Sequence, residues 1–175
     1  MAEKGFTRAF FPIVSTILIL VILLPTGATA LQYGDRAPLF ETDMLEGGTF
    51  SLKDHRGKDV VLLNFWSVFC RDCISRIEAL NKINDLYQKR NFVLIGIAGD
   101  PPTPRMLAQV KKYAAKMRYQ VILDPDLLIY ESYGVDIIPF AVLVDRDGKV
   151  VMAIQSLEPE PLKEISDRID ALTRE

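Results

Sequence analysis

Beyond residue 30, short apolar runs alternate along the chain with longer segments in which apolar residues recur every three or four positions. Four of the runs are nearly continuous and rich in branched side chains, at residues 60–65, 93–98, 121–123 and 140–144. Such runs are typical of strands that are covered on both faces. The segments between them predict amphipathic helices, each with one face on a core.

The predicted helices have apolar stripes at helical spacing. The first stripe is Cys73, Ile77, Leu80, Ile83 and Tyr87, and the last is Leu162, Ile165, Ile169 and Leu172. Between them, Thr103 and Pro104 are an N-cap followed by proline at the first helical position. They open a helix that extends to Met117. A short helix at residues 127–133 ends before Gly134.

Two hairpins complete the prediction. Gly47 and Gly48 separate two short stretches near the start, at residues 38–45 and 49–52, and residues 145–148 form a strong turn before a strand at 150–154. The order after the first hairpin is β-α-β-α-β-α-β-β-α. Early β-α-β units imply parallel strands and the late hairpin adds antiparallel ones, so we predict an α/β fold with a mixed central sheet and helices on both faces.

Composition narrows the function classes. The 175 residues are 49% hydrophobic and carry a net charge of −2, which excludes a disordered chain and argues against non-specific nucleic-acid binding. Two cysteines and one histidine cannot form a four-ligand Cys/His zinc site. No cofactor is expected beyond what the two thiols provide.

Residues 1–30 have the pattern of a targeting segment. Lys4 and Arg8 precede an uncharged stretch at residues 10–24, and Ala28 and Ala30 form a small-x-small cleavage pattern. The stretch is shorter than the roughly 20 apolar residues that span a bilayer. We favour a cleaved signal peptide over a retained N-terminal anchor, with one domain at residues 31–175 in the periplasm or another extracytoplasmic space.

The two cysteines, Cys70 and Cys73, stand directly after the first buried strand, where the first long helix begins. Unpaired N–H groups and the helix dipole favour an anion there, so a Cys70 thiolate is stabilised and can attack a disulfide. Cys73 lies one turn further along and can resolve the mixed disulfide. The pattern therefore indicates a redox-active dithiol.

Other interpretations of the pair are weaker. A structural disulfide across so short a loop removes little entropy from the unfolded chain, and a metal half-site has no partner ligands, since His55 stands on a polar segment. Two inert buried thiols are disfavoured in an oxidising compartment. Arg71 would favour the thiolate and Asp72 would oppose it, so both are candidate tuning residues and the sign of their net effect stays open.

The stretch from Leu62 to Cys73, LLNFWSVFCRDC, resembles the active-site segment of thioredoxin-like proteins, and most closely the exported TlpA/ResA type of thiol-disulfide oxidoreductase. The resemblance extends from about Tyr33 to the C-terminus. It implies a thioredoxin-like three-layer fold with an N-terminal hairpin, and catalytic roles for Cys70 and Cys73.

The resemblance also implies roles away from the cysteines. Residues 134–139 match the segment that carries a cis-proline in the family, so the Ile138–Pro139 bond is expected to be cis and to lie against the cysteine pair. Ile138 and Pro139 would then position the substrate backbone. Trp66 is a further candidate positioning residue, and it would pack around the active-site loop together with Phe69.

The chain departs from the family pattern at several positions. Asp72 replaces a common proline, and Phe140 replaces the threonine that often follows the cis-proline. The acids that assist proton transfer in relatives are replaced by Arg76 and Asn64. Asp72 or Glu78 are the remaining candidates for that task. The departures bear on the direction and strength of the redox couple.

We therefore expect an exported thiol-disulfide oxidoreductase that reduces protein disulfides and contributes to cell redox homeostasis. Its expected partners are disulfide-containing or dithiol proteins and an upstream membrane electron donor, and cytochrome c maturation is one pathway that relatives serve. The alternative is a copper-handling or docking module on the same fold, without redox turnover.

Overall fold

The structure is a computed structural model in which residues 31–174 are described. The predicted signal peptide or anchor, residues 1–30, lies outside the described residues. Within the described part, no helix has the length and apolar character needed to cross a membrane.

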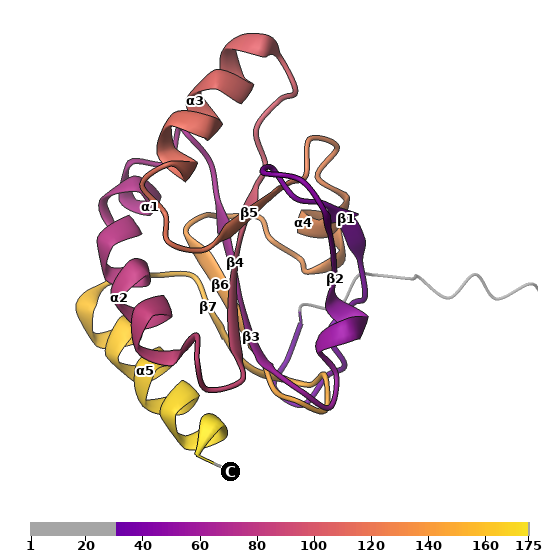
Figure 1. The fold of residues 1–175 in the computed structure, drawn as a ribbon, viewed down its shortest axis with the longest axis vertical. Helices are drawn as coiled ribbons and strands as arrows, with labels where there is room; N and C mark the ends of the chain where they lie inside the picture. Colours follow the sequence, from indigo (N-terminus) through magenta and orange to yellow (C-terminus); the bar gives the residue numbers. More distant parts are fainter. Residues whose placement is uncertain (1–30, 175) are drawn as a thin grey trace, which may run out of the picture.

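A five-stranded mixed sheet forms the centre of the fold, in the order β5-β4-β3-β6-β7 (Figure 1). The strands are β3 (Val60–Trp66), β4 (Phe92–Ala98), β5 (Gln120–Leu123), β6 (Phe140–Val144) and β7 (Val150–Ile154). β3, β4 and β5 run parallel, whereas β6 is antiparallel to both β3 and β7. All residues of β3 and β6 are buried, as the continuous apolar runs predict for strands covered on both faces.

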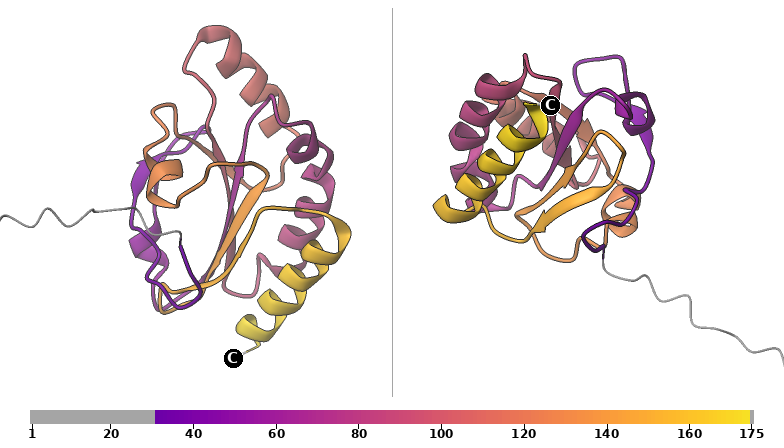
Figure 2. Two further views of the ribbon diagram at one scale, coloured as in Figure 1. Left: turned by 180° about the vertical axis from the view of Figure 1, so that it is seen from behind. Right: turned by 90° about the horizontal axis from the view of Figure 1, so that it is seen from below.

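Both faces of the sheet are covered, which confirms the predicted layering (Figures 1 and 2). One face carries α1 (Arg71–Ser75), α2 (Ile77–Tyr87), α3 (Pro104–Ala114) and α5 (Pro159–Thr173). The other carries α4 (Leu128–Ser132), the short helix η1 (Leu52–His55) and an antiparallel pair, β1 (Glu41–Asp43) with β2 (Thr49–Ser51). The predicted N-terminal hairpin is therefore confirmed, as a separate two-stranded sheet.

Successive side chains of β3 enter different cores because they point to opposite faces of the sheet. Leu63 and Phe65 pack beneath α4, and Leu62 packs beneath α2 and α5. At the carboxyl end of β3, Trp66 joins Cys73 in a third cluster that α3 covers. The cysteine pair is thus seated on packed core at one end of the sheet.

The first long helix differs from the prediction, because two helices, α1 and α2, meet at Arg76. The Arg76 N–H donates to the Cys73 carbonyl oxygen at 3.3 Å, a tighter i→i−3 turn that interrupts the α-helical ladder. The predicted stripe is buried in two places: Cys73 lies in the Trp66 cluster, and Leu80 lies in the core under α5. The break allows each part to face its own core.

The helix predicted to reach Met117 ends at Ala114 instead. The cause lies in α2, where the fully buried Asn81 side chain binds the segment that follows α3. Asn81 Oδ1 accepts from the Arg118 N–H at 2.7 Å, and Asn81 Nδ2 donates to the Lys116 carbonyl oxygen at 2.8 Å. These two bonds satisfy backbone groups that a longer helix would have paired internally.

Candidate active site

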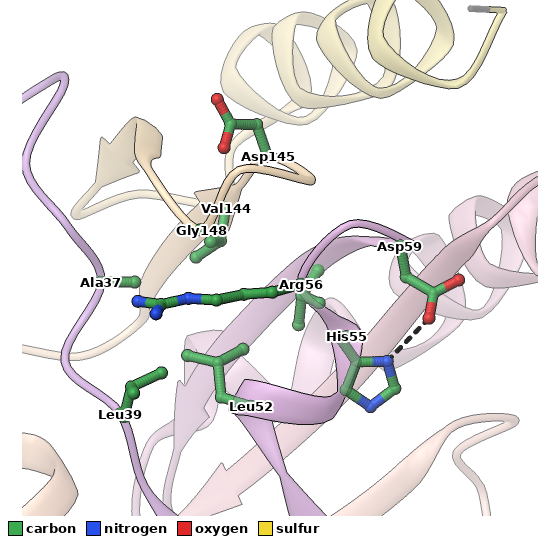
Figure 3. A pocket seen from close by; sticks show the side chains of 10 residues that line it. Ala37, Leu39, Leu52, His55, Arg56, Asp59, Val144, Asp145 and Gly148 are labelled. Carbon is green, nitrogen blue, oxygen red and sulfur yellow. Dashed lines mark hydrogen bonds and ion pairs between the residues drawn. The ribbon is translucent and has the colours of Figure 1, made fainter.

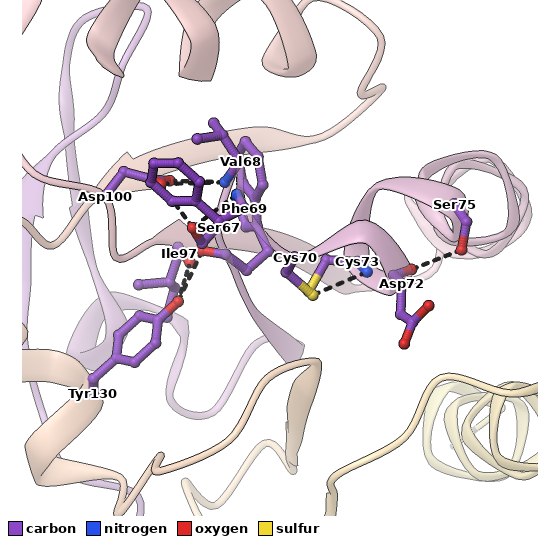
Figure 4. The surroundings of a disulfide bond; sticks show 11 residues. Ser67, Val68, Phe69, Cys70, Asp72, Cys73, Ser75, Ile97, Asp100 and Tyr130 are labelled. Atoms are coloured by element: carbon purple, nitrogen blue, oxygen red, sulfur yellow. Dashed lines mark hydrogen bonds between the residues drawn. A yellow bond between two sulfur atoms is a disulfide. The ribbon is translucent and has the colours of Figure 1, made fainter. Parts of the chain in front are cut away.

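Cys70 and Cys73 form a disulfide at the start of α1, with Cα atoms 5.2 Å apart (Figure 4). Cys70 is the N-cap of the helix, and its Sγ accepts a hydrogen bond from the Cys73 N–H at 3.1 Å. Cys70 is half-buried, whereas Cys73 is only 4% exposed. An incoming sulfur can therefore reach Cys70 more readily than Cys73, and the N–H that contacts Sγ would stabilise a thiolate there.

The loop between β3 and α1 presents Cys70. The Cys70 N–H donates to the Ser67 carbonyl oxygen at 3.0 Å, which closes a tight turn over residues 67–70. Phe69, within that turn, is 74% exposed beside the disulfide. Trp66, at its base, is 1% exposed, so its side chain supports the loop from below and has no surface to offer a substrate. Any role of Trp66 in substrate positioning therefore acts through the loop.

A buried carboxylate, Asp100, holds this loop from the segment that follows the neighbouring strand β4 (Figure 4). Its Oδ1 accepts from the Ser67 hydroxyl at 2.7 Å, and both of its oxygens lie 3.1–3.2 Å from the Val68 N–H. The side chain is 5% exposed. The sequence prediction missed Asp100. A signal was present, since an acid follows the second buried strand after a single glycine, and carboxyl ends of adjacent parallel strands meet at one edge of a sheet.

The Tyr130 hydroxyl extends the support of the loop, and Asp124 holds the first turn of α4, which carries Tyr130. The Tyr130 hydroxyl donates to the Trp66 carbonyl oxygen at 2.8 Å, and Asp124 Oδ2 accepts from the Ile129 and Tyr130 N–H groups at 3.0 and 2.9 Å. Burial raises the pKa of Tyr130, and the nearby carboxylates of Asp100 and Asp124 raise it further. The hydroxyl therefore remains a donor at neutral pH. The sequence prediction missed both residues: the Trp66 partner of Tyr130 is 64 positions away in sequence, whereas Asp124 binds N–H groups only five and six positions ahead.

The Ile138–Pro139 peptide bond is cis, which confirms that prediction. Ile138 packs against the cluster that contains Trp66 and Cys73, so the proline segment and the cysteine pair share one core. Ile137, just before it, is 62% exposed. Whether the backbone of Ile138 pairs with a substrate stays a prediction.

The proposed tuning residues, Arg71 and Asp72, are both exposed next to the disulfide. Solvent screens charges in such positions, so each acts weakly on the sulfurs. Among the former candidate acids, Glu78 is engaged elsewhere: its hydrogen bond with Arg118 lowers the pKa of the Glu78 carboxyl. Asp72 remains free to assist proton transfer, as a prediction.

The two positions where relatives carry a helper acid are also occupied differently. Asn64 is buried on β3, on the Trp66 side of the sheet, and its Oδ1 has no hydrogen-bond partner among residues 31–174. Arg76 forms an ion pair with Glu158, at 2.8 Å, which joins the α1–α2 junction to the start of α5. Neither side chain can accept a proton from a thiol at neutral pH.

Within residues 31–174, His, Cys, Asp and Glu side chains do not gather in any group of three that could hold a metal ion. A small pocket lies at the opposite end of β3 from the disulfide, where Arg56 extends between Leu52 and Gly148, and His55 binds Asp59 at 2.8 Å (Figure 3). That pocket contains none of the residues around the disulfide.

Comparison with known proteins agrees with this geometry. The family model described as "AhpC/TSA family" matches residues 33–153, more than half of the chain. The chain belongs to the AhpC/TSA family. Among its relatives in this family is the thiol-disulfide oxidoreductase ResA of Bacillus thuringiensis subsp. konkukian, 33% identical over 134 residues that cover 77% of this chain and 74% of that protein.

Solved structures give the same picture of the fold. A Chlorobium tepidum protein described as a DsbE-type thiol:disulfide interchange protein superposes with a TM-score of 0.74, at 27% identity, over 82% of this chain and 99% of its own. The thioredoxin domain of a thiol-disulfide oxidoreductase from Bacteroides vulgatus superposes with a TM-score of 0.67, at 25% identity, over 79% and 98%. The predicted thioredoxin-like fold and the thiol-disulfide oxidoreductase class are thereby confirmed.

Proposed function

We propose that this family member reduces disulfide bonds in proteins outside the cytoplasm, with Cys70 as the attacking thiol and Cys73 as the resolving thiol. The observation that carries the assignment is the difference in exposure. Cys70 is half-buried and caps α1, whereas Cys73 is 4% exposed. A protein disulfide can approach the Cys70 sulfur. The buried Cys73 sulfur can then attack only the Cys70 sulfur.

The steps balance as two thiol-disulfide exchanges. The Cys70 thiolate attacks one sulfur of the substrate disulfide, forms a mixed disulfide and displaces a substrate thiolate, which takes up a proton. The Cys73 thiolate then attacks the Cys70 sulfur, forms the Cys70–Cys73 bond and releases the second substrate thiol. Two electrons and two protons pass to the substrate. A dithiol protein, which we propose to be a membrane electron donor, restores the reduced pair.

Two features support reduction as the direction. Strong oxidants of this class owe their potential to a heavily stabilised thiolate. Within the described chain, the Cys70 sulfur accepts a hydrogen bond from one group, the Cys73 N–H. The nearby Arg71 is exposed and therefore screened. A reduction potential near that of thioredoxin, about −270 mV, would support the proposal, and a potential near that of DsbA, about −120 mV, would contradict it.

Trapping tests the roles of the two cysteines. A Cys73→Ser variant should accumulate mixed disulfides with partner proteins, because the resolving step is removed. The matched Cys70→Ser variant should accumulate none, since its remaining thiol is buried. Equal trapping by both variants would contradict the assignment. Stoichiometric Cu(I) binding against a strong chelator, with no disulfide exchange, would replace it with a copper-handling role.

The location and the pathway are part of the same proposal. The charge and apolar pattern of residues 1–30 supports export, by a cleaved signal or a retained anchor. Fractionation of cells that express the full chain, followed by mass determination of the N-terminus, tests this. The resemblance to the TlpA/ResA type favours cytochrome c maturation, and a deletion strain should then lose c-type cytochromes and regain them with the wild-type gene but not with Cys70→Ser.

A further inference from the structure

Asp100 has an unusual place for a carboxylate. It is 5% exposed, it lies two residues after the end of β4, and its hydrogen bonds reach across to the loop that presents Cys70. No Lys, Arg or His within the described residues forms a salt bridge with it; the carboxylate is held by the Ser67 hydroxyl and the Val68 N–H (Figure 4). Burying a charge without a countercharge destabilises the folded protein, so we looked for a functional role of the Asp100 charge.

The charge lies close to the reactive sulfur. Ser67 and Cys70 are the first and last residues of a tight turn, so their Cα atoms are within about 7 Å. Asp100 Oδ1 is 2.7 Å from Ser67 Oγ. The carboxylate is therefore on the order of 10 Å from the Cys70 sulfur, about one Debye length, and the intervening matter is protein, which screens less than water.

We propose that Asp100 is a positioning residue that holds the Cys70 loop and whose negative charge disfavours the Cys70 thiolate, which makes the dithiol pair a stronger reductant. A nearby anion raises the free energy of the thiolate but leaves the neutral disulfide almost unaffected. The reduced form then gives up its electrons more readily. This inference rests on the proposed reductase function and names the group that sets its direction.

Other charged groups around the pair do not produce this effect. On α1, Arg71 and Asp72 are exposed and opposite in sign, and Arg76 is paired with Glu158. Asp136, in the segment before the cis-proline, is exposed. These groups are screened by solvent or by their partners, unlike Asp100.

Two further titratable groups lie on the elements below the loop. Asp124 is 4% exposed, but its Oδ2 accepts from N–H groups of α4, and in the described part of the chain its side chain forms no hydrogen bond to the Cys70 loop. The Tyr130 hydroxyl is neutral, because burial raises its pKa. On α3, Tyr113 packs on the same cluster as the cysteines, with Lys116 over its ring. Asp124 is thus a natural control: a second buried carboxylate at the same edge of the sheet.

The test measures the thiolate of Cys70 in the reduced protein, from the rate of iodoacetamide alkylation between pH 5 and 10. Asp100→Asn keeps an oxygen acceptor for the loop but removes the charge. We expect the thiolate fraction below the titration midpoint to rise about three- to tenfold. Above the midpoint, the equilibrium constant for reduction of the Cys70–Cys73 disulfide by glutathione should rise by up to the same factor, because the reduced thiolate form is stabilised. A tenfold rise corresponds to 29.6 mV for two electrons. Asp124→Asn should change both by less than twofold.

Ser67→Ala separates charge from loop geometry, because it removes a hydrogen bond to Asp100 and leaves the charge in place. We expect the Ser67→Ala thiolate to titrate as in wild type or at a higher pH, never lower. Equal shifts in Ser67→Ala and Asp100→Asn, or no shift in Asp100→Asn while its circular dichroism shows a folded protein, would overturn the inference. A wild-type protein that alkylates normally but reduces no disulfide would instead refute the proposed function, so the two failures are distinguishable.

Discussion

Replacing Tyr130 by phenylalanine removes the hydroxyl that joins α4 to the base of the active-site loop. The ring itself is held independently of the hydroxyl: it meets the Phe65 ring edge-on at 5.1 Å and lies over Gly99. The Tyr130→Phe variant should therefore keep its packing and lose only its hydrogen bonds. Those run to the Trp66 carbonyl oxygen at 2.8 Å and the Ile97 carbonyl oxygen at 3.3 Å.

The expected loss follows from the partners that remain. The Trp66 carbonyl oxygen keeps a second donor, the Gly99 N–H at 3.2 Å, so it remains hydrogen-bonded in the variant. A buried hydrogen bond of this kind contributes about 1–2 kcal/mol once the residual desolvation of the carbonyl is included. For a domain of this size the midpoint of thermal unfolding should fall by about 3–6 °C.

Tyr133→Phe is the matched control. Its ring also packs on Phe65, at 5.5 Å, and its hydroxyl donates at 2.8 Å to the Pro38 carbonyl oxygen, on the far side from the disulfide. Denaturant unfolding of the oxidised proteins should show a similar loss for both variants, and only Tyr130→Phe should change the alkylation rate of Cys70. An unchanged stability for Tyr130→Phe, or equal alkylation effects in both variants, would refute the role of this hydroxyl in holding the loop.

Three further predictions concern the core and the surrounding network. Leu80→Ala, at a fully buried position of α2, should lower the free energy of unfolding by about 3–5 kcal/mol, whereas Leu86→Ala, at a 64% exposed position of the same helix, should lower it by less than about 1 kcal/mol in denaturant titrations. Gly99→Ala places a Cβ 2.8 Å from the Tyr130 ring and 2.9 Å from Leu127; it should cost about 1–3 kcal/mol and alter Cys70 alkylation, and wild-type behaviour in both assays would contradict the close packing. Burial raises the pKa of Tyr130 and of Tyr133 above their ordinary value of 10.0, so the folded protein binds these protons more tightly than the unfolded chain. Their contribution to stability is complete below about pH 10 and is lost as the pH rises from there through the pKa values of the folded protein. The free energy of unfolding, measured from pH 8 to 12, should therefore decline above pH 10, and less steeply in the tyrosine-to-phenylalanine variants. A flat profile would contradict the pKa shifts.

Local patterns predicted most of the secondary structure. The continuous apolar run before the cysteines became β3, and Thr103 caps α3 through a bond from the Met106 N–H at 3.3 Å, as its position before Pro104 predicts. These features depend on neighbours in sequence, so periodicity and capping preferences are sufficient to find them.

The errors arose where distant segments meet. The break at Arg76 follows from two cores that receive the two ends of one apolar stripe, and the early end of α3 follows from Asn81, which binds the chain at Lys116 and Arg118. Trp66 belonged to the expected site, and its burial became evident only once α3 and β5 covered it. The periodicity of apolar residues does not predict contacts between segments that are distant in sequence.

The amino-acid sequence alone determined that two thiols lie three residues apart at a strand-to-helix junction, because spacing and local periodicity are properties of neighbouring residues. The tertiary structure decided which sulfur is accessible and which polar groups surround it. Asp100 meets Ser67 only because β4 lies parallel to β3, and Tyr130 meets Trp66 only because α4 packs across that edge. Hydrogen bonds between segments depend on strand order and packing, and these are set by the burial of the whole chain.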